Sequence, residues 1–231
     1  MKNFSKIISV AIAFSLIFVL AGCDESTIEE AKPSPNLDAL QNDLQDGSYS
    51  QEVTLDNVSF KTTYTTDYDA KNWKITSPKT LTSEISITQI PAGTRVQIIH
   101  IHVDTSLLST QEQVQGLSID NMDDKLSSGT ESGIDVTKDY PYTLIFSIEG
   151  FSKDLISGWG FITGSYGCIS LSQNRLTESN LTDPKYGAGV YGQKFTYIYK
   201  FLIKNESDAG WHEVTFSDEF YVPVVHTATN Q

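Results

Sequence analysis

The chain has 231 residues, of which 39% are hydrophobic, 19% charged and 11% aromatic. This is ordinary globular composition, and it excludes a collagen, a coiled coil or a mostly disordered chain. Sixteen basic and 29 acidic residues give a formal net charge of −13. Because so acidic a chain repels the phosphates of nucleic acids, we expect no nucleic-acid partner.

The N-terminal segment has the pattern of a secretory signal. Two lysines precede an apolar run over 7–20, which is too short for a typical membrane-spanning helix. The run ends in the sequence Leu-Ala-Gly-Cys at 20–23, which closely resembles the lipobox of bacterial lipoproteins. The resemblance implies that residues 1–22 are a signal peptide, cleaved between Gly22 and Cys23, and that Cys23 carries a diacylglycerol thioether.

Lipidation of Cys23 would decide where the protein resides. Each buried methylene of an acyl chain contributes about 0.8 kcal/mol, and two chains suffice for stable anchoring. We therefore expect a protein anchored at the cell membrane, on its extracytoplasmic face, with no cofactor beyond the diacylglycerol on Cys23. A minor alternative concerns the signal itself, because the octet at 15–22 resembles peptides released as enterococcal sex pheromones.

Residues 23–48 form the next segment, and their composition predicts a flexible acidic tether. Seven acidic residues stand against the single base Lys32, and two prolines interrupt the stretch. A short helix capped by Asn36, with leucines on one face up to Leu44, is an alternative for its second half. Beyond the tether, Cys168 is the second of two cysteines, so Cys23, once acylated, leaves it no partner for an intramolecular disulfide.

Residues 49–231 predict one all-β domain, a mainly antiparallel β-sandwich. Apolar and polar residues alternate over 84–88, 143–149 and 195–204, which is the period of strands with one buried face. The sequence Pro-Ala-Gly at 91–93 predicts a β-hairpin between the strand before it and a strand over 95–104. The alternating residues over 214–224 predict two further strands, the last of them at a sheet edge because it contains Pro223.

The region Thr105–Pro141 does not follow this pattern. It is long, polar and weakly periodic, and long connections in compact domains are often binding surfaces. The alternative is a short helix over Leu107–Val114 followed by a disordered insert.

A histidine-rich strand offers the clearest candidate for metal binding. His100, His102 and Asp104 would share one face of a strand, and imidazole and carboxylate groups are common metal ligands. The run is similar to the HxHxDH motif of metallo-β-lactamases, but Thr105 occupies the position of its last histidine, so we reject that family. A metal-binding lipoprotein or metal-dependent hydrolase using these three residues is one hypothesis, and a polar sheet surface is the other.

Known catalytic motifs are missing from the sequence. The GxGxxG match at 187–192 lacks the strand before it and the helix after it that a dinucleotide site needs. The serine and cysteine in 164–168 do not have the spacing of a nucleophile elbow. We therefore expect a protein that is not an enzyme.

Four aromatic residues in or beside glycine-rich turns are candidate partner-binding residues: Trp159, Tyr186, Tyr191 and Trp211. Aromatic side chains on loops can stack on sugars or anchor a protein partner, although they can equally complete the core. The leading hypothesis is a lipid-anchored, non-catalytic binding or adaptor module whose partner is a protein or a cell-wall glycan.

Overall fold

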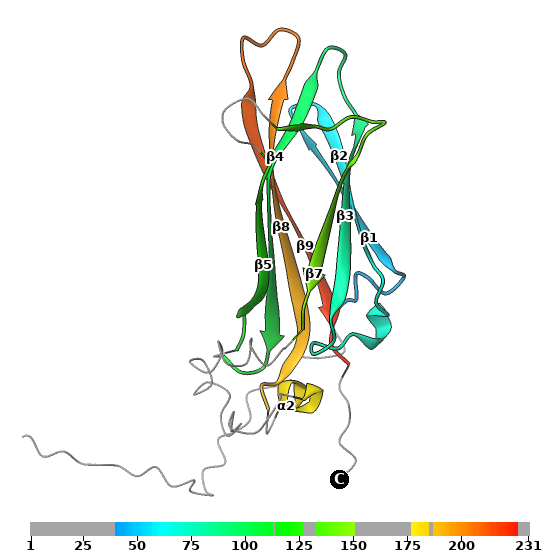
Figure 1. Ribbon diagram of the computed structural model, residues 1–231, viewed down its shortest axis with the longest axis vertical. Helices are drawn as coiled ribbons and strands as arrows, with labels where there is room; N and C mark the ends of the chain where they lie inside the picture. The colour runs from blue at the N-terminus through cyan, green and yellow to red at the C-terminus, as the bar shows by residue number, and fades with distance from the viewer. Residues whose placement is uncertain (1–39, 113, 127–132, 151–176, 185–186, 226–231) are drawn as a thin grey trace, which may run out of the picture. The chain divides into compact units, whose positions relative to one another are not determined.

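The computed structural model describes residues 40–112, 114–126, 133–150, 177–184 and 187–225. All of them belong to the second of the two units into which the chain divides, Ser34–Gln231. This unit is a β-sandwich of two antiparallel sheets (Figure 1), which confirms the fold class that the alternation predicts. None of the described helices is long and apolar enough to cross a membrane.

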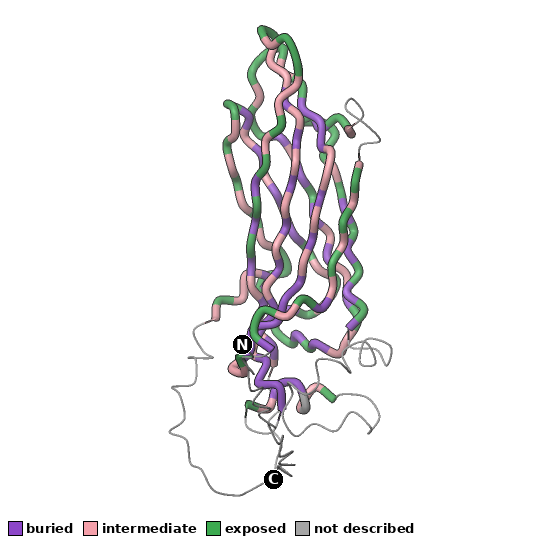
Figure 2. Tube along the Cα trace, turned by 90° about the vertical axis from the view of Figure 1, so that its left-hand side faces the viewer, coloured by how far each residue is buried: buried purple, intermediate pink, exposed green. Residues whose placement is uncertain are grey.

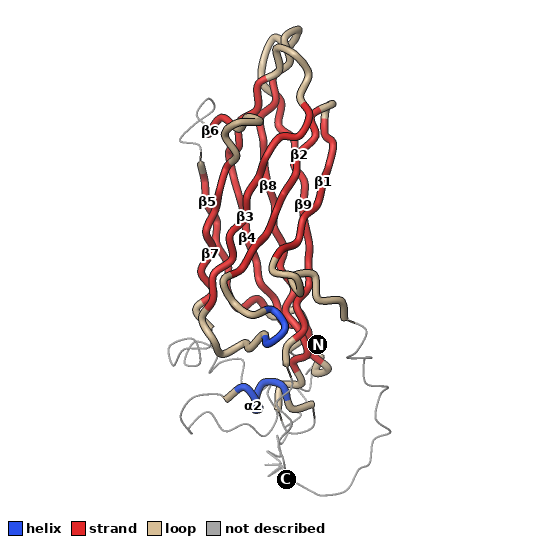
Figure 3. The backbone as a smooth tube through the Cα atoms, turned by 90° about the vertical axis from the view of Figure 1, so that its right-hand side faces the viewer, coloured by secondary structure: helices blue, strands red, loops and turns tan. Residues whose placement is uncertain are grey.

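Each sheet is built from long strands. The first sheet has the order β1-β2-β3-β7, with β1 (Ser48–Leu55), β2 (Val58–Thr66), β3 (Lys79–Gln89) and β7 (Tyr142–Ile148). The second has the order β5-β4-β8-β9, with β6 also beside β4: β4 (Arg95–Ser109), β5 (Ser118–Lys125), β6 (Ile134–Asp135), β8 (Val190–Lys204) and β9 (His212–Pro223). The described helices, η2 (Ala70–Asn72) and α2 (Glu178–Thr182), lie at one end of the sandwich (Figure 3).

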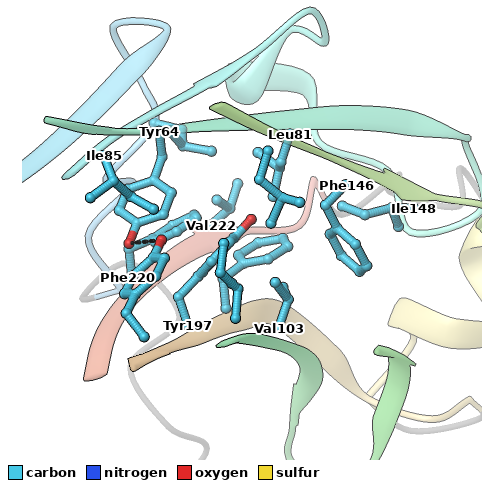
Figure 4. Packing of buried hydrophobic residues seen from close by; sticks show 14 of the residues in the cluster. Tyr64, Leu81, Ile85, Val103, Phe146, Ile148, Tyr197, Phe220 and Val222 are labelled. Carbon is cyan, nitrogen blue, oxygen red and sulfur yellow. Dashed lines mark hydrogen bonds between the residues drawn. The ribbon is translucent and has the colours of Figure 1, made fainter. Parts of the chain in front are cut away.

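The core lies between the two sheets, and it follows the predicted alternation. Along β8, five inward side chains are completely buried: Phe195, Tyr197, Tyr199, Phe201 and Ile203. Figure 4 shows Leu81 and Phe146 of the first sheet facing Phe220 and Val222 of the second. Figure 2 shows buried and less buried residues alternating along the strands, as expected where one face of each sheet is solvated.

The hairpin predicted around 91–93 is wrong. β3 pairs with β2 and β7, whereas β4 pairs with β5, β6 and β8, so the chain crosses from one sheet to the other at this turn. Gly93 has φ +72°, and a Cβ added there would lie 2.9 Å from the Cβ of Glu206. Glycine at position 93 is therefore needed for the conformation of the turn. The type of turn does not, however, decide which sheet the following strand joins.

The long connection predicted for Thr105–Pro141 is also wrong over much of its length. β4 continues to Ser109, β5 occupies Ser118–Lys125, and β6 adds a short pairing beside β4. The alternative helix over Leu107–Val114 is wrong because the first three of these residues extend β4 and the chain then turns. The two strands predicted over 214–224 are in fact the single strand β9, which lies at the edge that Pro223 predicts.

The last part of the predicted tether packs against the sandwich. Leu44 is completely buried, and the Asp43 backbone N–H donates to the Tyr221 carbonyl at 3.0 Å. The Tyr221 N–H in turn donates to the Asp43 carboxylate at 2.8 Å. The predicted boundary at 48 therefore lies too late, because residues 40–47 belong to the folded domain. The described part of the alternative helix, 40–44, is not helical.

Candidate functional site

Three connections meet at the end of the sandwich that is uppermost in Figure 1: the β3–β4 turn, the segment after β6 and the β8–β9 turn. A pocket of about 410 Å³ opens there, within the size range of small-molecule sites. Val96 and Val136, both buried, give it an apolar floor. Its other lining residues are Ile90, Thr94, Arg95, Asp135, Thr137 and Lys138.

Arg95 is held in place by two neighbours at this pocket. Its guanidinium lies 3.5 Å from the Asp135 carboxylate and 5.3 Å from the centre of the Trp211 ring. Gln97 donates a further hydrogen bond of 2.9 Å to the same Asp135 oxygen. The Arg95 and Asp135 side chains are 61% and 58% exposed, so this ion pair is weak and the guanidinium remains accessible to a ligand.

A hydrogen-bond network fixes the turns around the pocket. The Thr94 hydroxyl donates to the Asn205 side chain at 3.0 Å, and Asn205 donates two bonds of 2.9 Å to Asp208. His212 lies 2.5 Å from Asp56 in the β1–β2 turn and 3.7 Å from Asp208. These contacts connect turns from both sheets and so stabilise the end of the sandwich at which the pocket lies.

The three predicted metal ligands point to one face of their strand, as expected, but they do not contact one another as a group. His100, His102 and Asp104 all lie on the outer face of β4, as the alternation predicts. The Asp104 carboxylate, however, accepts a hydrogen bond from Ser118. Asp123 of β5 lies instead beside the histidines, with one carboxylate oxygen 2.6 Å from His100 Nε2 and 3.5 Å from His102 Nδ1.

The pKa shift of Asp123 is the one expected for a carboxylate that contacts two histidines at the protein surface. The hydrogen bond from His100 is the largest effect that lowers the pKa of Asp123, and His102 adds to it. Among the described residues, no group of three or more His, Cys, Asp or Glu side chains has the arrangement to hold a metal ion. This face therefore gives the metal hypothesis no geometric support.

The core contains a polar cluster that sequence reasoning missed. Asp218 is 1% exposed, and its carboxylate accepts hydrogen bonds of 2.8 Å from Thr62 and from Tyr64. The Tyr64 hydroxyl also lies 2.9 Å from that of Tyr199. The second Asp218 oxygen has no hydrogen-bond partner in the described part of the chain. Burial raises the pKa of Asp218, although the hydrogen bonds from Thr62 and Tyr64 act in the opposite direction.

A buried lysine occupies the opposite end of the sandwich. Lys79 is 5% exposed, and its ammonium donates to two backbone carbonyls in the 74–77 loop, at 2.7 Å each. It also lies 4.7 Å from the Trp73 ring centre and 5.2 Å from that of Tyr68. Burial lowers the pKa of Lys79 to about 8, while nearby carboxylates oppose the shift. Because its donors are engaged within the fold, Lys79 holds this loop together.

The two predicted aromatic residues that the structure describes do not lie on one surface. Trp211 follows the β8–β9 turn beside the pocket, whereas Tyr191 lies near the start of β8. The 15 residues of β8 separate them by about 45 Å. Trp159 and Tyr186 lie outside the described residues, as do Gly22, Cys23 and the octet at 15–22.

Comparisons with known proteins add little to this geometry. The chain matches no protein-family model and no curated protein. A solved structure of a protein from Archaeoglobus fulgidus is similar at 10% identity, over 77% of this chain and 97% of that one, with a TM-score of 0.27. The C-terminal domain of wzt is similar at 9% identity, over 84% of this chain and 90% of that one, with a TM-score of 0.32. Neither likeness supports a functional assignment.

Proposed function

We propose that the protein is a lipid-anchored, extracytoplasmic binding module that holds its ligand in the pocket at Arg95 and performs no catalysis. The position of this pocket carries the proposal. It lies where turns from both sheets meet, and its lining combines buried apolar residues with charged ones, as ligand sites commonly do. It also includes residues from the region Thr105–Pro141 and lies beside Trp211, two features that the sequence singles out.

The path of the chain fits this role. Residue 40 enters the sandwich beside Gly192, near the start of β8, where a Cβ added to that glycine would overlap the Leu40 side chain. The pocket lies near the other end of the same strand, about 45 Å away. The pocket and the point at which the described chain enters the sandwich therefore lie near opposite ends of β8.

The pocket chemistry indicates the kind of ligand. Arg95 and Lys138 contribute two cations in a chain with a formal net charge of −13, and Lys138 makes no ion pair with any described residue. Guanidinium and ammonium groups bind carboxylates and phosphates. We therefore expect a ligand with an anionic group and an apolar body, borne by a wall glycan or a protein.

Site-specific photo-crosslinking on living cells tests this proposal. A photoreactive amino acid at Thr137 lines the pocket, and the same amino acid at Ser217, on the exposed face of β9, is the matched control. We expect one adduct from position 137 that is missing from position 217 and is weakened by Arg95→Gln. Equal adducts from both positions, or none from position 137, would contradict the placement of the site.

A further inference from the structure

The edge strand β7 lacks the usual protection against pairing with another strand. It has the sequence YTLIFSI, with no charged residue, proline or glycine in its seven positions. It pairs with β3 alone, and its backbone makes no other hydrogen bond to any residue that the structure describes. Natural edge strands usually carry charges, prolines or bulges, because free N–H and C=O groups are a template for another strand. The open side of β7 is therefore able to accept one.

Exposed apolar side chains lie along the same edge. Ile145, at the centre of β7, points to the outer face of the first sheet and is 65% exposed. Tyr140, just before the strand, is 74% exposed. In the described part of the chain, these are two of the three large hydrophobic residues that are exposed; the third is Ile134. A strand added beside β7 would cover Ile145 if its own outward side chains were apolar.

The acidic strand β5, the edge of the second sheet, lies along β7 on the same side of the sandwich (Figure 3). Near one end of β7, the Asp120 carboxylate accepts a hydrogen bond of 3.2 Å from the Glu149 N–H. At the other end, the charge of Asp124 adds to the effect of burial in raising the pKa of Tyr142, the first residue of β7. An incoming strand beside β7 would therefore meet the negative charge of β5.

Two carboxylates of β5 are directed toward this edge without a cationic partner. Asp120, Met122 and Asp124 each pair with a completely buried residue of β4, so they point to the inner side of the second sheet. Within the described ranges, neither Asp120 nor Asp124 forms an ion pair. Lys79, whose charge acts to lower the pKa of Asp120, donates instead to backbone carbonyls. The negative charge along this edge is thus left for a partner to neutralise.

We infer that β7 and β5 together bind an extended segment of a partner protein, one that alternates basic and apolar residues and adds as a strand beside β7. Successive side chains of a strand point to opposite faces of its sheet. Basic side chains on the inner face would reach Asp120 and Asp124, and their methylene stems would cover Met122. Apolar side chains on the outer face would cover Ile145. Backbone hydrogen bonds to β7 supply affinity in this mode of binding, and the alternating side chains supply specificity.

Charge decides for a basic partner strand over a second copy of this chain. In a second copy, the acidic strand β5 lies along β7 in the same way, so pairing two β7 strands would bring two β5 strands together in a chain with a formal net charge of −13. A basic segment is attracted by the same carboxylates. The surface also differs from the pocket at Arg95, for which we propose an anionic ligand, so each proposal can fail without the other.

Hydrogen–deuterium exchange of the detergent-extracted full chain tests this inference with defined probes. The probe is a short synthetic peptide that alternates lysine and valine. We expect it to slow amide exchange in β7 and to leave β1, the other edge of the same sheet, unchanged. A peptide with glutamate in place of lysine should protect neither strand. A lysine peptide with a central proline keeps the charge but cannot pair as a strand, so it should not protect β7 either.

A matched pair of variants tests the role of β5. Asp124→Asn should weaken binding of the lysine peptide about threefold, and less at high salt, as expected for one partly exposed ion pair. Glu52→Gln, which removes a charge from β1, should bind it as the wild type does. Equal protection of β1 and β7, no protection of β7, or equal protection by the lysine and glutamate peptides would overturn the inference. Protection of β7 that rises with protein concentration in the absence of peptide would identify a second copy as the occupant and overturn it as well.

Discussion

Replacing Asp218 by asparagine removes the buried charge from the core and tests how that charge affects folding. Burial raises the pKa of this carboxyl above the ordinary aspartate value of 3.8, and Asp43 adds to the shift. Between 3.8 and the raised pKa, the folded protein holds a proton that the unfolded chain has lost. The wild type therefore loses stability as pH rises through this window, by up to about 1.4 kcal/mol per pH unit, and its stability relative to the variant is constant above it.

Urea denaturation of the wild type and of Asp218→Asn, at a series of pH values from 3.5 to about 8, measures this difference. The asparagine oxygen can still accept from Thr62 and Tyr64. Any cost of burying the amide group is the same at every pH. It therefore shifts the variant's free energy of unfolding by a constant and leaves its pH dependence unchanged. We expect the free energy of unfolding of the variant, minus that of the wild type, to increase as pH rises from 3.8 to the raised pKa of Asp218. A pH-independent difference, or a wild type that gains instead, would refute the reasoning.

Three further predictions concern other parts of the fold. Between pH values of about 8 and 10.5, folded wild-type protein has released the Lys79 proton that the unfolded chain still holds, so the wild type gains stability as pH rises. Lys79→Met lacks this gain and should therefore become less stable relative to the wild type over the same range. A difference in urea midpoints that does not change with pH would contradict this. Asn57 has φ +64° in the β1–β2 turn, a conformation that alanine adopts poorly and glycine adopts readily. Asn57→Ala should therefore lower the free energy of unfolding by about 1 kcal/mol, whereas Asn57→Gly should not. Equal losses in the two variants would contradict the turn geometry. Elemental analysis after dialysis should find no stoichiometric zinc or copper, and a 1:1 metal that disappears in the His100→Ala, His102→Ala variant would revive the metal hypothesis.

The alternation of apolar residues made much of the sandwich predictable. It identified the buried faces of β7, β8 and β9, because a strand with one solvated face repeats every two residues. The same signal failed for β5, an edge strand whose sequence is largely acidic and polar, with Ile119 as its one buried apolar side chain. Sheet membership was not predictable, since the turn at 91–93 is compatible with a hairpin or with a crossing between sheets.

The candidate site was predictable only in fragments. Trp211 and the region around Asp135 stand out in the sequence, but their meeting at Arg95 depends on the crossing from β3 to β4. Asp218 was missed although it occupies an inward position between Phe216 and Phe220. An acidic residue in phase with buried aromatic residues is a usable signal, and it indicates a buried carboxylate that needs hydrogen-bond donors from the facing sheet.

The anchor at Cys23 is the claim on which the proposed function depends most, and metabolic labelling with an alkyne-bearing palmitate analogue tests it directly. The two cysteines of the chain supply a matched pair of variants. We predict that the wild type and Cys168→Ser incorporate the label equally, and that Cys23→Ser incorporates none. Label that persists in Cys23→Ser, or an unlabelled wild type, would contradict the account.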